Sequence, residues 1–367
     1  MTRALLTMVL VVACDGPTGV DAGSLLDAAP LEDATTTVDA GGRDAGPAQL
    51  DAAVGEDAGA GAPIEGRLAD GEEIVVRGAG FPEREHARPL IWADFEEGTD
   101  PTPLGRLTRW DDFGGELTDA VVAPSSSHAV RYDHGAGSGA AGGRVRFDSE
   151  RLYVFAKRYH DFDITESAAW GPRGFNHKTI RLWNRCGAAC DYRQNNLYFG
   201  YQGMEGGNPR VVAEYTNAGT LWGGPPPQPR RWMQEEWLYR SSRVDAEDGV
   251  FDYVLDGVAQ WEHRFRNRTP DYPGRYDYLV FDQVSNGTGP GSHFSYHDDV
   301  YVDTTWTRAM ITDAPTLAES RIREIQIPIA WSATEIRLRV RRGAHPSFEG
   351  RYLLVIGEDG GEQAFPL

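Results

Sequence analysis

Short runs of alternating apolar and polar residues recur from about residue 64 to the end of the chain. In the stretch 175–184, Ile180 and Leu182 alternate with Thr179, Arg181 and Trp183, the two-residue period of a strand with one buried face. Gly, Asn, Asp and Pro turns separate such runs, and no segment shows the period of an amphipathic helix. The pattern predicts an all-β protein of the sandwich or barrel class. The clearer expected strands are 143–147, 152–159, 177–183, 196–202, 211–215, 232–240, 250–255, 276–281 and 294–303.

The first 63 residues lack this pattern. Residues 4–12 form an apolar run behind Arg3 that is too short to span a bilayer, and the run ends at Val11-Val12-Ala13-Cys14. This ending resembles the bacterial lipobox, in which a small residue precedes a lipidated cysteine. The resemblance implies a lipoprotein signal peptide over 1–14, lipidation of Cys14, and an exported protein anchored to the cell envelope, at the outer membrane or cell surface. An ordinary signal peptide with a chance cysteine is the alternative.

Residues 15–63 repeat Asp-Ala and Asp-Ala-Gly and contain few large apolar side chains. Such a segment buries too little surface to offset its ordering entropy, so we expect a disordered acidic tether. The whole 367-residue chain carries a net charge of −19, which argues against nucleic-acid binding. An acidic chain is compatible with a carbohydrate partner, although a polyanionic glycan would need a local basic groove. The 10 Trp, 15 Tyr and 43 Gly residues indicate a β-rich, loop-rich protein with many aromatic faces.

Two resemblances divide the remaining chain. Residues 71–81 (GEEIVVRGAGF) form a strand and a glycine turn that resemble the opening of an IPT/TIG immunoglobulin-like domain. Asp94-Phe95-Glu96-x-Gly98 instead resembles the first strand of a concanavalin A-like jelly roll. Strands that would complete the immunoglobulin-like domain appear only near the C-terminus. We therefore expect a discontinuous immunoglobulin-like sandwich (64–90 plus 317–367) holding an inserted jelly roll (91–316). The alternative is one continuous sandwich from 90 to 367.

The stretch 175–184 (FNHKTIRLWN) carries an unusual density of candidate site chemistry. Strict alternation places His177, Arg181 and Trp183 on one face and Lys178 on the other. Cys186 and Cys190 follow it around a short flexible loop, which favours a disulfide over a metal pair that would lack a second pair of ligands.

Saccharide recognition uses aromatic faces for stacking and planar polar groups for hydroxyls. The residues expected to bind a glycan are Lys157, Tyr159, His177, Arg181, Trp183, Asn196 and Tyr198. A lyase acting by β-elimination would add a base and a group that neutralises the uronate carboxylate. The residues that could do so are His177, Arg181, Tyr198, Gln202 and Tyr296. Alternation prevents all of these side chains from sharing one face, and the familiar alginate-lyase strand motifs are absent.

Paired aspartates occur at Asp298 and Asp299, but neighbouring strand residues point oppositely and cannot form a glycosidase pair. The jelly-roll resemblance instead implies a structural Ca²⁺ held by Asp94, Glu96, Gly98, Asp298 and Asp299. Hydrogen-bonded turn aspartates are the alternative reading. No phosphate-binding loop, nucleophile elbow, zinc motif or dinucleotide fingerprint occurs, so we expect no organic cofactor.

These observations favour a surface-anchored, monomeric carbohydrate-binding protein that recognises a polysaccharide through a concave jelly-roll face. The first alternative is a polysaccharide lyase acting on a uronate-containing glycan. The second is a structural cell-surface module without catalysis. Nucleic acid is not an expected partner, and contact with a membrane is expected only through the lipid anchor.

Overall fold

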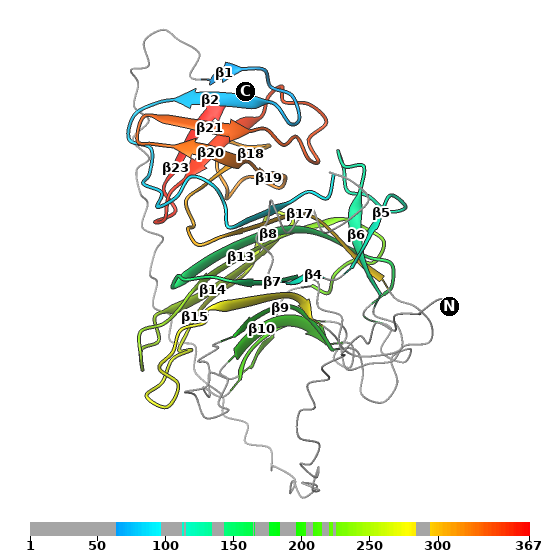
Figure 1. Ribbon diagram of the computed structural model, residues 1–367, viewed down its shortest axis with the longest axis vertical. Helices are drawn as coiled ribbons and strands as arrows, with labels where there is room; N and C mark the ends of the chain where they lie inside the picture. The colour runs from blue at the N-terminus through cyan, green and yellow to red at the C-terminus, as the bar shows by residue number, and fades with distance from the viewer. Residues whose placement is uncertain are drawn as a thin grey trace, which may run out of the picture. The chain divides into compact units, whose positions relative to one another are not determined.

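The computed structural model describes residues 64–96, 112–113, 115–133, 143–163, 165, 176–183, 196–202, 208–214, 220–222, 225–283 and 294–367. These residues belong to one unit, Ala60–Leu367. Every regular element among them is a β-strand, and the strands form four antiparallel sheets (Figure 1). The all-β prediction is confirmed. None of the described segments forms a helix with the length and apolarity needed to cross a membrane.

Two large curved sheets form the main sandwich. The eight-stranded sheet has the order β15-β14-β13-β8-β17-β6-β5, and β3 also pairs with β17. Its strands are β3 (Ile91–Ala93), β5 (Glu116–Thr118), β6 (Ala129–Asp133), β8 (Arg151–His160), β13 (Met233–Arg240), β14 (Gly249–Leu255), β15 (Val258–Phe265) and β17 (Phe294–Asp303).

The seven-stranded sheet has the order β12-β11-β10-β9-β16-β7-β4. Its strands are β4 (Asp112–Phe113), β7 (Gly143–Arg146), β9 (Asn176–Trp183), β10 (Asn196–Gln202), β11 (Asn208–Glu214), β12 (Thr220–Trp222) and β16 (Tyr278–Gln283). Alternate residues of the two sheets meet in one apolar core, where Phe199 of β10 packs against Trp237 of β13 and Tyr253 of β14. This pair of sheets is the sandwich expected of the jelly roll.

Two four-stranded sheets form a smaller sandwich. Their orders are β1-β2-β21-β20 and β19-β18-β22-β23, and they enclose a separate core that includes Ile74, Ile311, Leu338 and Leu353. The strands are β1 (Ile64–Gly66), β2 (Glu73–Arg77), β18 (Arg308–Thr312), β19 (Arg323–Ile325), β20 (Ile327–Trp331), β21 (Glu335–Arg339), β22 (Tyr352–Ile356) and β23 (Glu362–Pro366).

The chain runs from β2 into the large sandwich and returns at β18. Because β18 pairs with β22, the small sandwich already resumes at Arg308, ahead of the expected boundary at 317. The outer face of the eight-stranded sheet packs on it: Tyr153 and Tyr301 share a cluster with Met310 and Leu354. Figure 1 shows the small sandwich following the two large sheets as further layers.

The two segments that cross between the sandwiches are tied together. Arg84 in the first crossing pairs with Asp303 at the end of β17, and both side chains are fully buried. The Tyr301 hydroxyl donates to the same carboxylate at 2.7 Å, and His86 Nε2 lies 2.8 Å from its other oxygen. Burial alone would lower the pKa of Arg84, but the adjacent Tyr301 and Asp303 oxygens hold that pKa above its usual range.

Candidate functional site

A β-bulge in β9 determines which of its side chains share a face. In the pairing with β10, Phe199 lies opposite Ile180, but the next residue, Gly200, lies opposite Lys178. Thr179 therefore has no partner in β10 and is the extra residue of the bulge. Leu197 and Phe199 face the core, which leaves Tyr198 on the outer face of the sheet. Lys178 Nζ lies 4.8 Å from the centre of the Tyr198 ring, so Lys178 is on the outer face as well.

Two residues support this bulge. A Cβ atom at Gly200 would lie 2.0 Å from the backbone oxygen of His177, so the strand tolerates only glycine opposite the bulge. Arg158 of β8, which is fully buried between the sheets, donates to the hydroxyl of Thr179. Its Nε lies 2.9 Å from Glu235, which offsets the cost of burying the charge.

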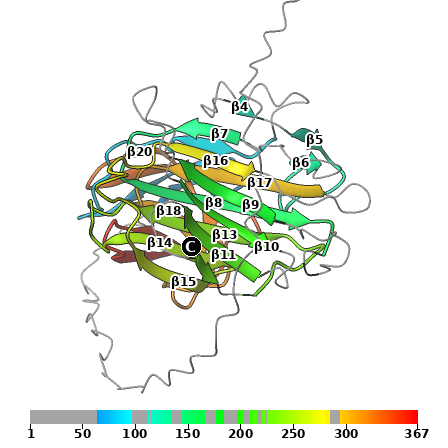
Figure 2. The same cartoon turned by 90° about the horizontal axis from the view of Figure 1, so that it is seen from below.

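The outer face of the seven-stranded sheet gathers cations and aromatic rings from neighbouring strands. Val145 and Phe147 face the core, so Arg144 and Arg146 of β7 point outward. Strand β16 lies between β7 and β9 (Figure 2). Within this order, Tyr278 of β16 is paired with both Arg146 of β7 and Trp183 of β9.

We call this set the basic aromatic face: Arg144, Arg146, Lys178, Arg181, Trp183, Tyr198 and Tyr278. The Arg181 guanidinium lies 3.6 Å from the centre of the Trp183 ring, a cation–π contact. Among the outward side chains of β7, β9, β10 and β16 that the structure describes, four are cations; Asp282 of β16 takes an outward position by the same alternation, but its side chain lies outside the described part of the chain.

The structure separates the predicted site residues into three places. Arg181, Trp183 and Tyr198 share the basic aromatic face. His177 does not join them: the bulge turns it inward, where it is fully buried with its ring centroid 5.5 Å from that of His160.

The third place is the outer face of the eight-stranded sheet. Tyr159 and Tyr296 pack there edge to face at 5.5 Å, and Lys157 is buried in an ion cluster. These three residues come from a different sheet and cannot line the same surface as Arg181. Asn196 and Gln202 take positions in β10 opposite Trp183 and Asn176, and their side chains lie outside the described part of the chain.

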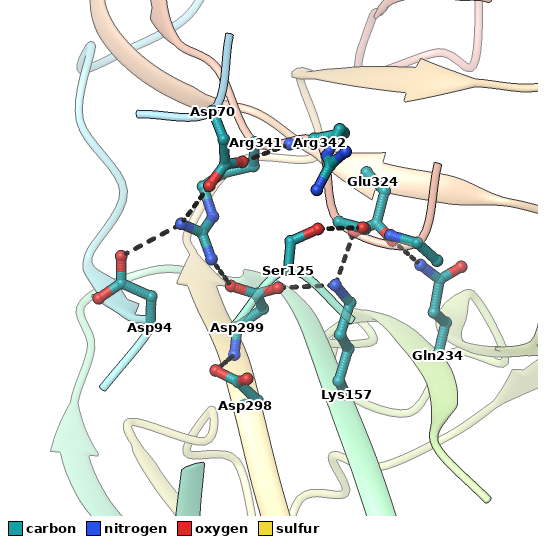
Figure 3. Close-up of polar contacts among 12 residues, drawn as sticks. Asp70, Asp94, Ser125, Lys157, Gln234, Asp298, Asp299, Glu324, Arg341 and Arg342 are labelled. Atoms are coloured by element: carbon teal, nitrogen blue, oxygen red, sulfur yellow. Dashed lines mark hydrogen bonds and ion pairs between the residues drawn. The ribbon is translucent and has the colours of Figure 1, made fainter. Parts of the chain in front are cut away.

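Three of the residues expected to hold calcium, Asp94, Asp298 and Asp299, are engaged with cations and backbone groups (Figure 3). Asp299 accepts from Lys157 at 2.7 Å and from Arg341 at 2.9 Å. Burial by itself would raise the pKa of Asp299, but these two cations lower that pKa below its usual value. Arg341 also lies 3.8 Å from Asp94.

The other two described members are held by backbone amides. Glu96 accepts from the backbone of Ser127 at 2.8 Å, and Asp298 accepts from that of Asp299 at 2.7 Å. Among the described residues, no group of three or more His, Cys, Asp or Glu side chains converges as metal ligands would. Gly98 lies outside the described residues, so the calcium site stays a prediction.

The cysteine assignments also fall outside the described residues. Lipidation of Cys14 and a disulfide between Cys186 and Cys190 therefore stay predictions, as does the envelope location that the first of them implies.

Sequence reasoning missed four members of the basic aromatic face: Lys178, which strict alternation placed on the other face, and Arg144, Arg146 and Tyr278. The alternation Arg144-Val145-Arg146-Phe147 already places two arginines on one side of a strand. It does not say which strand lies beside it, because β7 reaches β9 only through β16, which follows much later in the chain.

No protein-family model matches the chain, and no curated protein matches it. Among solved structures, the chain is similar to alginate lyase Aly36B, with 11% identity over 59% of this chain and 98% of that chain at a TM-score of 0.43. It is similar to an alginate lyase from Aplysia kurodai, with 14% identity over 57% and 97% at a TM-score of 0.42.

A third similar structure is the endo-β-1,4-glucuronan lyase of Trichoderma reesei, with 15% identity over 60% of this chain and 97% of that chain at a TM-score of 0.42. Similarities of this degree do not show a shared activity or substrate. The function of this chain is therefore argued from its own residues.

Proposed function

We propose that the basic aromatic face binds an acidic polysaccharide. The observation that carries this proposal is the gathering of four cations around the half-buried Trp183 ring, with Tyr198 and Tyr278, each 5% exposed, packed beside them. Aromatic rings stack on the C–H faces of sugars, and arginine guanidinium groups bind carboxylates through two parallel hydrogen bonds. A chain of uronate units presents both kinds of surface in each repeat.

Binding to a polyuronate tests this proposal. Replacing Arg181 with alanine removes a charge-assisted contact worth about 1.5–3 kcal/mol, so we expect R181A to bind polygalacturonate or alginate roughly 10- to 100-fold more weakly. Isothermal titration calorimetry with defined oligouronates measures the loss. Because the attraction is electrostatic, binding by the wild type should weaken as salt is raised.

The matched control is R337A. Arg337 lies in β21 of the small sandwich, where it is 46% exposed and pairs with Glu73. R337A should bind as the wild type does. Equal binding by R181A and R337A, or no binding of any polyuronate by the wild type, would refute the proposal and favour a module without a glycan ligand.

A second candidate function, β-elimination, is favoured by the contact between Lys178 and Tyr198 beside Arg181. In this reaction a base removes the proton α to the uronate carboxylate and an acid protonates the departing glycosidic oxygen, as the C–O bond breaks and a ring C=C bond forms. Lys178 and Tyr198 would share the acid and base roles, and Arg181 would neutralise the carboxylate. His177 and Tyr296 have no part in this arrangement.

The product of elimination absorbs ultraviolet light through its unsaturated uronate. A rise in that absorbance with a polyuronate would establish lyase activity, and Y198F, which keeps the ring and removes the hydroxyl, should abolish the rise while retaining binding. Binding without any rise by the wild type would leave the protein as a carbohydrate-binding protein.

A further inference from the structure

A row of aromatic rings crosses the outer face of the eight-stranded sheet, opposite the core. Tyr296 of β17 lies beside Tyr159 of β8, and Trp232 follows just before β13. Ring centroids are 6.4 Å apart from Phe294 to Tyr296, 5.5 Å from Tyr296 to Tyr159, and 5.7 Å from Tyr159 to Trp232. We call these four residues the aromatic row.

The aromatic row is partly accessible. Trp232, Tyr159 and Phe294 are half-buried, whereas Tyr296 is 6% exposed and supports Tyr159 edge to face. Because neighbouring strands are about 4.7–4.9 Å apart, rings carried by successive strands recur at close to the length of one pyranose unit. The half-buried rings of Tyr159 and Trp232 suit stacking along a sugar chain at this spacing, whereas Arg131 lies over the Phe294 ring.

A cavity of about 200 Å³ adjoins the row at its Trp232 end. Pro124 and Met233 supply apolar walls, and Arg231, Asp256 and Arg321 supply polar ones. The site therefore combines a stacking surface with a recess that has both donors and acceptors, the combination that fixes the orientation of a bound ring.

Ion pairs neutralise several of the charged groups along this surface. Arg131, which lies 4.6 Å from the centre of the Phe294 ring, pairs with Glu116 at one end of the row. Arg231 pairs with Asp256 at the other end. The Lys157 ammonium that borders the cavity lies within 3.0 Å of both Asp299 and Glu324 and is neutralised by them.

We propose that the aromatic row and its cavity form a second binding site, which takes an uncharged, hydroxyl-rich polysaccharide. It lies on the outer face of the eight-stranded sheet, whereas the basic aromatic face belongs to the seven-stranded sheet. The site is independent of the proposed acidic-glycan site, because the two share no residue and the core of the large sandwich lies between them.

Affinity electrophoresis of the full chain tests the second site. Native gels contain hydroxyethylcellulose, galactomannan or polygalacturonate, each at several concentrations and at low and high salt. We expect at least one neutral polysaccharide to retard the wild type and R181A equally and with little dependence on salt. W232A should reduce that retardation roughly tenfold, in line with the loss of about one stacked ring.

The control is V258A, which removes an apolar side chain that is 44% exposed on β15 and touches neither site. V258A should be retarded as the wild type is. Y159F keeps the ring and should retain binding, whereas Y159A should lose it; melting temperatures confirm that each variant is folded.

Three results would overturn the second site. The first is that no neutral polysaccharide retards the wild type. The second is that W232A and Y159A are retarded as strongly as the wild type. The third is that sedimentation shows a dimer of the wild type that is absent for W232A. The last result would make the row an interface between copies of the chain. R181A in the polygalacturonate gels reports on the acidic-glycan site separately, so either proposal can fail without the other.

Discussion

Asp298 lies fully buried in β17 next to a second carboxylate, that of Asp299. Burial is the main cause that raises the pKa of Asp298 well above its ordinary value, and the Asp299 charge adds to it. The pKa of Asp299 is lowered instead, because Lys157 and Arg341 neutralise its charge. The two adjacent aspartates therefore have pKa values shifted in opposite directions.

The raised pKa of Asp298 predicts that this residue makes the fold less stable as the pH rises. An acid with a raised folded-state pKa contributes most to stability below its unfolded-state pKa, about 3.9, and loses that contribution as the pH rises through the folded-state value. D298N should therefore raise the melting temperature at neutral pH and have a much smaller effect below about pH 3.5. Thermal unfolding at both pH values measures the difference.

D148N is the control, since the Asp148 side chain is 92% exposed. It should change the melting temperature little at either pH. A lower melting temperature for D298N at neutral pH would show that the Asp298 charge stabilises the fold.

At the residue scale, strict alternation placed some of the candidate side chains on the correct face of the sheet and others on the wrong face. Arg181, Trp183 and Tyr198 share a face because each keeps strict alternation. His177 and Lys178 exchange faces because they lie beyond the extra residue, Thr179, and alternation cannot reveal where an extra residue is inserted.

At the scale of elements, β9 and β10 depend on each other through Gly200. G200A would place a Cβ 2.0 Å from the His177 backbone oxygen, and backbone on both sides would have to move. We expect G200A to cost about 1–3 kcal/mol of unfolding free energy. It should also weaken polyuronate binding, because Lys178 is placed by the same bulge.

Urea unfolding and calorimetry measure the two effects of G200A. G361A is the matched control, since its nearest new contact is a flexible Asp359 side chain at 3.2 Å. It should change the unfolding free energy by less than about 0.5 kcal/mol and leave binding intact. Wild-type stability of G200A would mean that the bulge is not required.

A glycine inside a strand is a recognised sign of a bulge, and Asn196 to Gln202 contains one. The sign is incomplete, however, because the glycine lies in β10 and the extra residue lies in β9. The bounds of β8, β13 and β17 lie within one residue of those expected from the sequence. Pairing between β9 and β16 joins segments about a hundred residues apart, which no local pattern encodes.

At the scale of the whole molecule, Arg341 joins the two sandwiches. It follows β21 of the small sandwich and binds Asp299 of the large one at 2.9 Å, with only 6% of its surface exposed. R341M would leave the buried Asp299 with one cation fewer, at a cost of about 3–5 kcal/mol. Urea unfolding of R341M measures that cost.

R337M removes the arginine four residues earlier in the chain, which is exposed. It should cost less than about 1 kcal/mol. Equal costs for R341M and R337M would show that the link between the sandwiches contributes no more than a surface ion pair.

Ile336, Leu338 and Val340 alternate with Arg337, Arg339 and Arg341, which is the pattern of a strand with one buried face and one solvent-exposed face. That description fits Arg337 and Arg339, which are exposed, but Arg341 is covered by the large sandwich. A sequence pattern distinguishes the apolar face of a strand from its polar face. It does not show which part of the polar face another sheet will cover. Because a sequence pattern does not show which sheet a strand joins, the chain was expected to re-enter the small sandwich at residue 317, whereas it does so at β18.

The paired crossings at Arg84 and Asp303 have a consequence for proteolysis. The large sandwich is joined to the small one by two stretches of chain, so one cut in either stretch leaves the other link whole. Because Arg84, Tyr301 and Asp303 bind across the two stretches, a nicked chain would also keep its cut ends close together. Release of the large sandwich as a soluble fragment would require two separate cleavages.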